Sequence, residues 1–440
     1  MTKLKSIAAV TLLLFLGAGM VSCSSSKPGS TDTNPLLQLL ADSSLHHAHT
    51  GILVQDAAGG KVLIAHQADR YFVPASNTKL FTLYAALKHL PDSLLAGTMW
   101  PQADGSAFFS SAADPTFLHP DFANHKLAST LKTYPQVYWL NPTLQTTAYG
   151  NGWSWNDYEA TYMAPRSSFP IFGQEATFSL RQGKLAASPP QALQLIASNS
   201  LQATDTGFSI SRGFETATFD LKPGRITRTN ISLYPTTHTL LPMLSSTLGN
   251  RWQIANTASF YANSPGVPIY ATPTDSMLKP LMHNSDNFFA EQTLLMISHQ
   301  WWGLMNERNV IDSILKTNLA KLPQRPRWVD GSGLSRYNLF TPQSIVWLLQ
   351  QMHNEFGLPR LQNILPTGNK GTLTNYYTNL TGKIFAKTGT LSGVVALSGY
   401  LTSRHGRLLY FSTLVNNHTG AATAVRRAIE RFLVQIWNTY

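Results

Sequence analysis

The alternation of apolar and polar residues predicts the first elements of the chain. Two short apolar runs, residues 51–55 and 61–65, flank a turn that contains two glycines, and together they predict a β-hairpin. A leucine-rich stretch ahead of them, residues 36–48, predicts a helix. The apolar run 80–87 predicts a second helix, which Pro91 should end.

The C-terminal part of the chain predicts three more strands and a final helix. The strands are expected at residues 383–386, 394–401 and 407–415, and the helix at 421–437. Combined with the hairpin, they predict a five-stranded antiparallel sheet with the first and last helices on one face. The expected fold class is α/β (α+β).

The middle of the chain has a different pattern of apolar and polar residues. From residue 96 to 265, many short apolar stretches are broken by Gly, Pro, Asn and Thr, which predicts a β-rich insertion of one or two small domains. Helical patterns return after it at residues 274–302, 307–321 and 341–355. We therefore expect one domain formed by residues 35–95 and 266–440, interrupted by the insertion.

The N-terminus carries the pattern of an export signal. In residues 1–22, two lysines precede the apolar stretch 6–20, and Val21, Ser22 and then Cys23, the only cysteine of the chain, follow. This arrangement resembles a bacterial lipoprotein signal, in which Cys23 would be acylated and would anchor the protein to a membrane. Residues 23–34 would form a flexible tether. The alternative is a plain secretory peptide with an incidental cysteine.

Net charge narrows the choice of partners. The chain has 33 Lys and Arg against 22 Asp and Glu, a formal charge of +11, which suits an anionic partner such as a membrane surface or the cell wall. No dense basic cluster or nucleic-acid motif is present, so we expect no nucleic-acid partner. The histidines at positions 46, 47 and 49 lack the further spaced ligands of a zinc site. We expect no metal and no cofactor.

One short motif brings a serine close to a lysine. Ser76 and Lys79 precede the helix at 80–87 and, three residues apart, should project from the same face of its first turn. A serine hydroxyl is a weak nucleophile at neutral pH, and a lysine held neutral in a buried, cation-rich site can accept its proton. Ser-x-x-Lys recurs elsewhere in the chain, so this spacing alone also fits a solvated helix pair.

Two later segments distinguish Ser76 from the other copies. Ser285-Asp286-Asn287 follows, and then a Lys-Thr-Gly-Thr segment that begins at Lys387. These three elements in this order form the signature set of penicillin-recognising serine acyltransferases.

The longer sequence contexts narrow the resemblance further. The tract from residue 284 to 291 and the segment DGSGLSRYN at 330–338 resemble the serine-type D-alanyl-D-alanine carboxypeptidase/endopeptidase family, the class C low-molecular-mass penicillin-binding proteins. The resemblance extends over roughly residues 51–440 and is weakest at 181–245. It implies the transpeptidase fold shared by penicillin-binding proteins and β-lactamases.

The resemblance also implies catalytic roles. Ser76 would attack the carbonyl of the penultimate D-Ala of a peptidoglycan stem peptide, with Lys79 as the base, and water would hydrolyse the acyl-enzyme. Ser285, helped by Lys387, would pass a proton to the leaving nitrogen, and Asn287 would hold the substrate backbone. β-Lactams would inhibit the enzyme by acylating the same serine.

A strand edge is implied as the substrate-binding element. Lys387 would start the turn off a strand that lines the cleft, where a peptide can pair along Thr388, Gly389 and Thr390. The threonine hydroxyls and the lysine charge would suit the terminal carboxylate. The backbone N–H groups of Ser76 and Thr390 would form the oxyanion hole.

Asp157 and Arg336 are candidates for substrate selection. Asp157 lies in a family-like tract of the insertion, and Arg336 lies in the DGSGLSR segment. One fixed anion and one fixed cation would suit the zwitterionic centre of a diaminopimelate side chain. The alternative is that Asp157 caps a turn and Arg336 forms a structural ion pair.

Two other functions remain open at this point. A β-lactamase or esterase of the same fold would share the motifs but has no use for an insertion of this length. An inactive wall-binding lipoprotein would not need Ser76, Lys79, Ser285, Asn287 and Lys387 together. We expect an exported D,D-peptidase that is lipid-anchored in the outer membrane and faces the periplasm.

Overall fold

The structure is a computed structural model that describes residues 34–255 and 265–440. The expected signal peptide at 1–22 and the acylation site Cys23 lie outside these residues. Within the described part of the chain, no helix is both long enough and apolar enough to span a bilayer.

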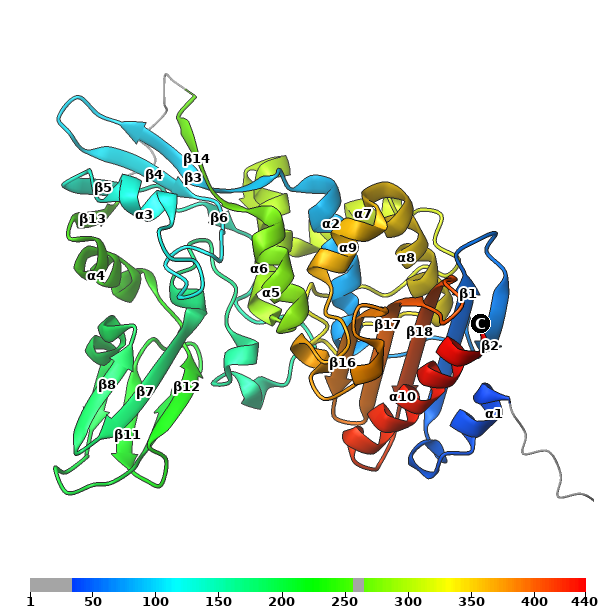
Figure 1. Cartoon of the computed structure of the whole chain (residues 1–440). Coiled ribbons are helices and arrows are strands. Elements are labelled where there is room, and N and C mark those ends of the chain that lie inside the picture. Colours follow the sequence, from blue (N-terminus) through cyan, green and yellow to red (C-terminus); the bar gives the residue numbers. More distant parts are fainter. Residues whose placement is uncertain (1–33, 256–264) are drawn as a thin grey trace, which may run out of the picture. The chain divides into compact units, whose positions relative to one another are not determined.

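A five-stranded antiparallel sheet, which we call the main sheet, confirms the expected fold class (Figure 1). Its order is β16-β17-β18-β1-β2. The strands are β1 (His49–Asp56), β2 (Val62–His66), β16 (Ile384–Leu391), β17 (Val394–Thr402) and β18 (Leu408–Asn416). Ile52 of β1 lies opposite Thr413 of β18, so the two ends of the chain close one sheet. β16 is left as an edge strand.

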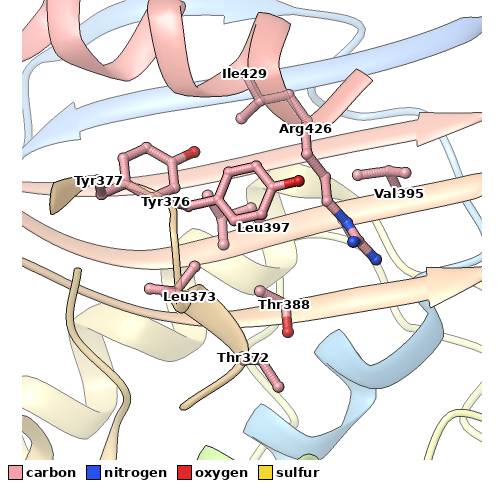
Figure 2. A pocket seen from close by; sticks show the side chains of 10 residues that line it. Thr372, Leu373, Tyr376, Tyr377, Thr388, Val395, Leu397, Arg426 and Ile429 are labelled. Carbon is pink, nitrogen blue, oxygen red and sulfur yellow. The ribbon is translucent and has the colours of Figure 1, made fainter. Parts of the chain in front are cut away.

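Two helices cover one face of the main sheet, as the sequence predicts. They are α1 (Pro35–Leu40) and α10 (Ala422–Thr439), and their apolar side chains share a core with the strands. Figure 2 shows Arg426 and Ile429 of α10 above the strands, where they line a small cavity of about 20 Å³ that Thr388 of β16 also lines.

The first helix is shorter than the predicted 36–48. α1 ends at Leu40, and a separate 3-10 turn, η1 (Ser43–Leu45), follows it. The carboxylate of Asp42 accepts a hydrogen bond from the backbone N–H of Ser44, which starts this turn afresh. A short side chain that competes for backbone donors therefore divides the leucine-rich stretch.

A larger group of helices packs against the opposite face of the main sheet and forms the main core. They are α2 (Lys79–His89), α5 (Thr274–His283), α6 (Asn287–Trp302), α7 (Glu307–Lys316), α8 (Pro342–Phe356) and α9 (Leu358–Ile364). α7 ends at Lys316 instead of 321, because Thr317 leaves the helical conformation.

The insertion contains its own sheets around one shared apolar core. The larger sheet consists of β3 (Ser93–Pro101), β4 (Ala107–Ser111), β5 (Gln136–Trp139), β13 (Arg251–Ile254) and β14 (Val267–Pro273). The two smaller sheets consist of β7 (Glu175–Arg181), β8 (Lys184–Ser188) and β12 (Arg228–Ser232), and of β9 (Ile196–Asn199), β10 (Phe208–Arg212) and β11 (Phe219–Pro223). The helices α3 (Lys126–Leu131) and α4 (Thr237–Leu248) complete it, and β6 (Thr143–Leu144) pairs with β15 (Leu304–Met305) outside it.

The pairing of β14 changes the expected boundary. β14 pairs antiparallel with β3, so residues 267–273 belong to a sheet of the insertion and not to the domain that contains the main sheet. This pairing joins strands far apart in sequence, which local patterns do not reveal. We propose that the insertion extends over residues 93–273.

Candidate active site

Ser76 lies in a 3-10 turn, η2 (Ala75–Thr78), which leads directly into α2. Nζ of Lys79 donates a hydrogen bond to Oγ of Ser76 at 3.0 Å, so the pair meets as the spacing predicts. Ala75, just before the serine, is held at φ 47°, a left-handed conformation that is rare for alanine. Such local strain is typical of functional sites, where the surrounding structure holds it in place.

Lys79 is fully buried and binds three acceptors from different segments. Besides Ser76, it donates to Oδ1 of Asn287 at 2.5 Å and to the backbone carbonyl of Ser332 at 2.6 Å. Burial lowers the pKa of Lys79 to about 8, although the nearby carboxylates of Asp330, Asp286 and Glu291 act in the opposite direction. A lysine with this pKa has a substantial neutral fraction near physiological pH and can accept a proton.

A second serine and lysine pair lies in the same site. Nζ of Lys387 donates to Oγ of Ser285 at 2.8 Å and to the carbonyl of Thr388 at 2.8 Å. Burial, and then the charge of Lys79, lower the pKa of Lys387 well below its ordinary value. Ser285 also has a left-handed backbone, with φ 57°. Each hydroxyl is therefore paired with one buried amine.

The Lys-Thr-Gly-Thr segment lies inside β16, which corrects the expectation that Lys387 starts a turn. The strand continues to Leu391, and Lys387 is paired with Ser398 of β17. Nδ2 of Asn77 donates to the carbonyl of Lys387 at 2.9 Å and ties the strand to the Ser76 turn. A Cβ at Gly389 would lie 2.7 Å from the carbonyl oxygen of Pro74, so only glycine permits this close approach.

Asp330 organises the DGSGLSR loop, and the sequence analysis did not identify it. This fully buried carboxylate accepts the backbone N–H groups of Gly333 and Ser335 at 2.8 and 2.7 Å and the indole N–H of Trp153 at 2.8 Å. These bonds hold the carbonyl of Ser332 against Lys79. The available signal was an aspartate directly before a Gly-Ser-Gly segment.

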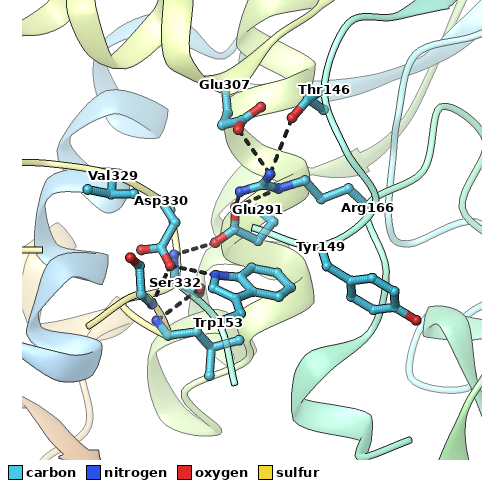
Figure 3. Close-up of polar contacts among 12 residues, drawn as sticks. Thr146, Tyr149, Trp153, Arg166, Glu291, Glu307, Val329, Asp330 and Ser332 are labelled. Carbon is cyan, nitrogen blue, oxygen red and sulfur yellow. Dashed lines mark hydrogen bonds and ion pairs between the residues drawn. The ribbon is translucent and has the colours of Figure 1, made fainter. Parts of the chain in front are cut away.

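An ion-pair network connects the insertion to this loop (Figure 3). The guanidinium of Arg166, in the insertion, donates to Oε2 of Glu291 at 2.7 Å and to Oε1 of Glu307 at 2.9 Å. The other oxygen of Glu291 accepts the backbone N–H of Ser332 at 2.7 Å. Arg166 thus supports the Lys79 site through two intervening groups. No sequence motif pointed to this arginine.

Asn287 also contacts the insertion. Its Nδ2 donates to the carbonyl of Tyr162 at 2.7 Å, while its Oδ1 binds Lys79. Asp286, just before it, accepts the backbone N–H of Phe289 at 2.8 Å and caps α6.

One cavity of about 530 Å³ contains most of the predicted site residues. Its lining includes Ser76, Ser285, Asn287, Thr390, Asp157 and Arg336. Lys79 and Lys387 lie buried behind it, hydrogen-bonded to its two serines.

Asp157 and Arg336 reach this cavity from opposite parts of the chain. Arg336 is exposed, and its Nη1 donates to the carbonyl of Ser392 at 3.2 Å. Burial, and then a hydrogen bond with Asp157, raise the pKa of the Tyr162 hydroxyl. Neither residue forms an ion pair within residues 34–255 and 265–440.

The described residues include no cluster of side chains suited to binding a metal ion. Among them, no group of three or more His, Cys, Asp or Glu side chains could hold a metal ion. The ring of His49 stacks on Phe72 with centroids 4.1 Å apart, and those of His46 and His47 meet edge to face at 4.6 Å. His46 and His47 are exposed, and His49 is partly buried.

Comparisons with known proteins agree with this geometry. A D-alanyl-D-alanine carboxypeptidase from Actinomadura sp. (strain R39) is 27% identical over 450 residues, which cover 89% of this chain and 82% of that protein. The structure of penicillin-binding protein 4 from Haemophilus influenzae superposes with a TM-score of 0.70 at 16% identity, covering 92% of this chain and 98% of that one. A predatory peptidoglycan endopeptidase from Bdellovibrio bacteriovorus superposes with a TM-score of 0.52 at 15% identity, covering 89% and 93%. Both structures share the fold.

The family comparison is decisive because it covers well over half of the chain. Residues 33–205 and 268–437 match the family described as D-Ala-D-Ala carboxypeptidase 3 (S13), in agreement with the resemblance carried by the motifs. The chain therefore belongs to the D-Ala-D-Ala carboxypeptidase 3 (S13) family and is a serine-type D,D-peptidase of peptidoglycan.

Proposed function

We propose that the chain hydrolyses D-Ala-D-Ala termini and D-Ala-diaminopimelate cross-links of peptidoglycan through an acyl-enzyme on Ser76. The observation that carries this proposal is the presence of two serine and lysine pairs at one cavity, Ser76 with Lys79 and Ser285 with Lys387. The names of the Actinomadura and Bdellovibrio proteins support the two activities. A β-lactam complex of the Haemophilus protein supports inhibition by β-lactams.

We propose a route for each proton that uses these two pairs. Lys79 in its neutral form accepts the hydroxyl proton of Ser76 as the oxygen attacks the carbonyl. Ser285 donates its proton to the leaving nitrogen and is resupplied by Lys387, to which it is hydrogen-bonded. Backbone N–H groups of Ser76 and Thr390 would stabilise the oxyanion, at about 3 kcal/mol per donor. Water then hydrolyses the ester.

Ser76 should be the acylated residue. Peptide mapping after labelling with fluorescent penicillin should place the adduct on the peptide that contains Ser76, and Ser76→Ala should abolish the label. Label that survives this substitution would contradict the assignment. A long-lived adduct supports a peptidase, whereas rapid turnover of a chromogenic cephalosporin would support a β-lactamase.

The rate of acylation should follow the ionisation of Lys79. Because only the neutral amine accepts a proton, and the pKa of Lys79 is lowered to about 8, the rate should rise with pH from 6 to 8 and level off above. Stopped-flow measurement of penicillin acylation across this range tests the expectation, with thermal unfolding at each pH as the control. A rate that stays flat from pH 5 to 9 would contradict the role.

We further propose that Asp157 and Arg336 bind the zwitterionic end of a diaminopimelate side chain. Both line the cavity that contains Ser76, which places an anion and a cation within one site. These contacts would distinguish stem peptides from penicillin, because penicillin lacks the zwitterionic end.

Asp157→Asn and Arg336→Ala should each lower kcat/KM for diaminopimelate-containing muropeptides at least tenfold, about 1.4 kcal/mol of transition-state binding. Penicillin acylation should remain nearly unchanged. Mass analysis of digests of muropeptide dimers and pentapeptide monomers provides the measurement. Equal loss toward both kinds of substrate would mean that the residues only support the site.

We also propose that Cys23 is acylated and anchors the enzyme to the outer membrane on its periplasmic side, since it stands shortly after an apolar segment. Cys23→Ser should leave the protein in the soluble fraction after cell lysis. Unchanged partitioning into membranes would show that this cysteine is incidental.

A further inference from the structure

A substrate carboxylate is bound well by a cation that keeps donors free of protein acceptors. Lys387 is fully buried, and its amine already donates to Ser285 and to the carbonyl of Thr388. Its lowered pKa also reduces its charge. At the edge strand β16, Thr390 is exposed and lines the active-site cavity.

Arg426 is hydrogen-bonded to this edge. It projects from the first turns of α10 across the face of the main sheet, and Figure 2 shows its guanidinium extended past Val395 toward the β16 side. Its Nη2 donates to Oγ1 of Thr390 at 2.7 Å. An arginine on the last helix thus contacts a residue of the active-site cavity.

The other arginines of α10 have carboxylate partners. Arg427 pairs with Glu430 at 2.5 Å, and Arg431 pairs with Asp42 at 2.5 Å. Within the described part of the chain, no carboxylate pairs with Arg426. Its charge is therefore available to a ligand.

The direction of this hydrogen bond leaves the Thr390 hydroxyl able to bind a ligand together with Arg426. Because Oγ1 of Thr390 accepts from Arg426, the hydroxyl hydrogen can be donated elsewhere. A guanidinium has five N–H donors, and the one contact with Thr390 leaves others for a second acceptor. A carboxylate beside Thr390 would meet an O–H donor and a permanent cation together.

We propose that Arg426, together with Thr390, binds the terminal carboxylate of the substrate. This inference rests on the proposed function and names one specificity-determining residue of its site. A free D-Ala terminus and the D-centre of a cross-link both carry a carboxylate next to the scissile nitrogen. The same contact would therefore serve carboxypeptidase and endopeptidase substrates.

A pair of N-acyl-D-alanyl thioesters tests the proposal. The two differ only in the leaving thiol, which carries either a free carboxylate or its methyl ester. Arg426→Gln should lower kcat/KM for the acid at least twentyfold and for the methyl ester less than twofold. Arg426→Lys should recover part of the loss, because it restores the charge without the planar fork.

Arg431→Gln provides the matched control, since this arginine lies on the same helix, pairs with Asp42 and does not contact the cavity. Both substrates should be turned over within twofold of the wild-type rate. Equal losses for the acid and the ester in Arg426→Gln, or no loss for either, would overturn the proposal. A wild-type protein that turns over neither thioester and forms no Ser76 adduct would instead overturn the proposed function, and the inference with it.

Discussion

The burial of the Lys79 amine is the constraint on which the rest of the site depends. An ammonium group removed from water is strongly destabilising unless polar groups surround it. Here Ser76, Asn287 and Ser332 supply three acceptors from the segment before α2, the start of α6 and the DGSGLSR loop. A shift of any one segment would leave the amine with a missing partner. One buried nitrogen therefore sets the relative positions of three distant pieces of chain and aligns the Ser76 hydroxyl with the Lys79 amine.

The same constraint explains why the insertion belongs to the catalytic unit. Glu291 holds the loop at Ser332, and a buried glutamate needs a counter-charge, which Arg166 of the insertion provides. The tyrosine carbonyl that binds Asn287 also comes from the insertion. Buried ion pairs contribute little net energy but strongly penalise the loss of one partner. The network thus acts mainly by fixing geometry.

Patterns along the sequence predicted the features that depend on residues close together in the chain. Ser76 and Lys79 meet because they are three residues apart at the start of a helix, and the strands of the main sheet follow from their apolar runs. The patterns did not reveal contacts between distant segments. The pairing of β14 with β3, on which the proposed boundary rests, joins distant strands, and Arg166 and Arg426 belong to no motif. Lys387 was expected to start a turn, but the strand continues through Gly389. The close approach of the Pro74 carbonyl, which is distant in sequence, explains why this position is a glycine.

The lysines and arginines of this site differ in how permanent their charge is. The two buried lysines, Lys79 and Lys387, have lowered pKa values, which suits groups that must gain and lose protons. A group whose pKa lies closer to neutral pH is a poor permanent anchor for an anion, because its charge varies with pH. Arginine keeps its charge at all relevant pH values and presents a planar fork to a carboxylate. Arg336 and Arg426 donate hydrogen bonds to Ser392 and Thr390, where a permanent positive charge would suit an anion and would leave the two buried amines undisturbed.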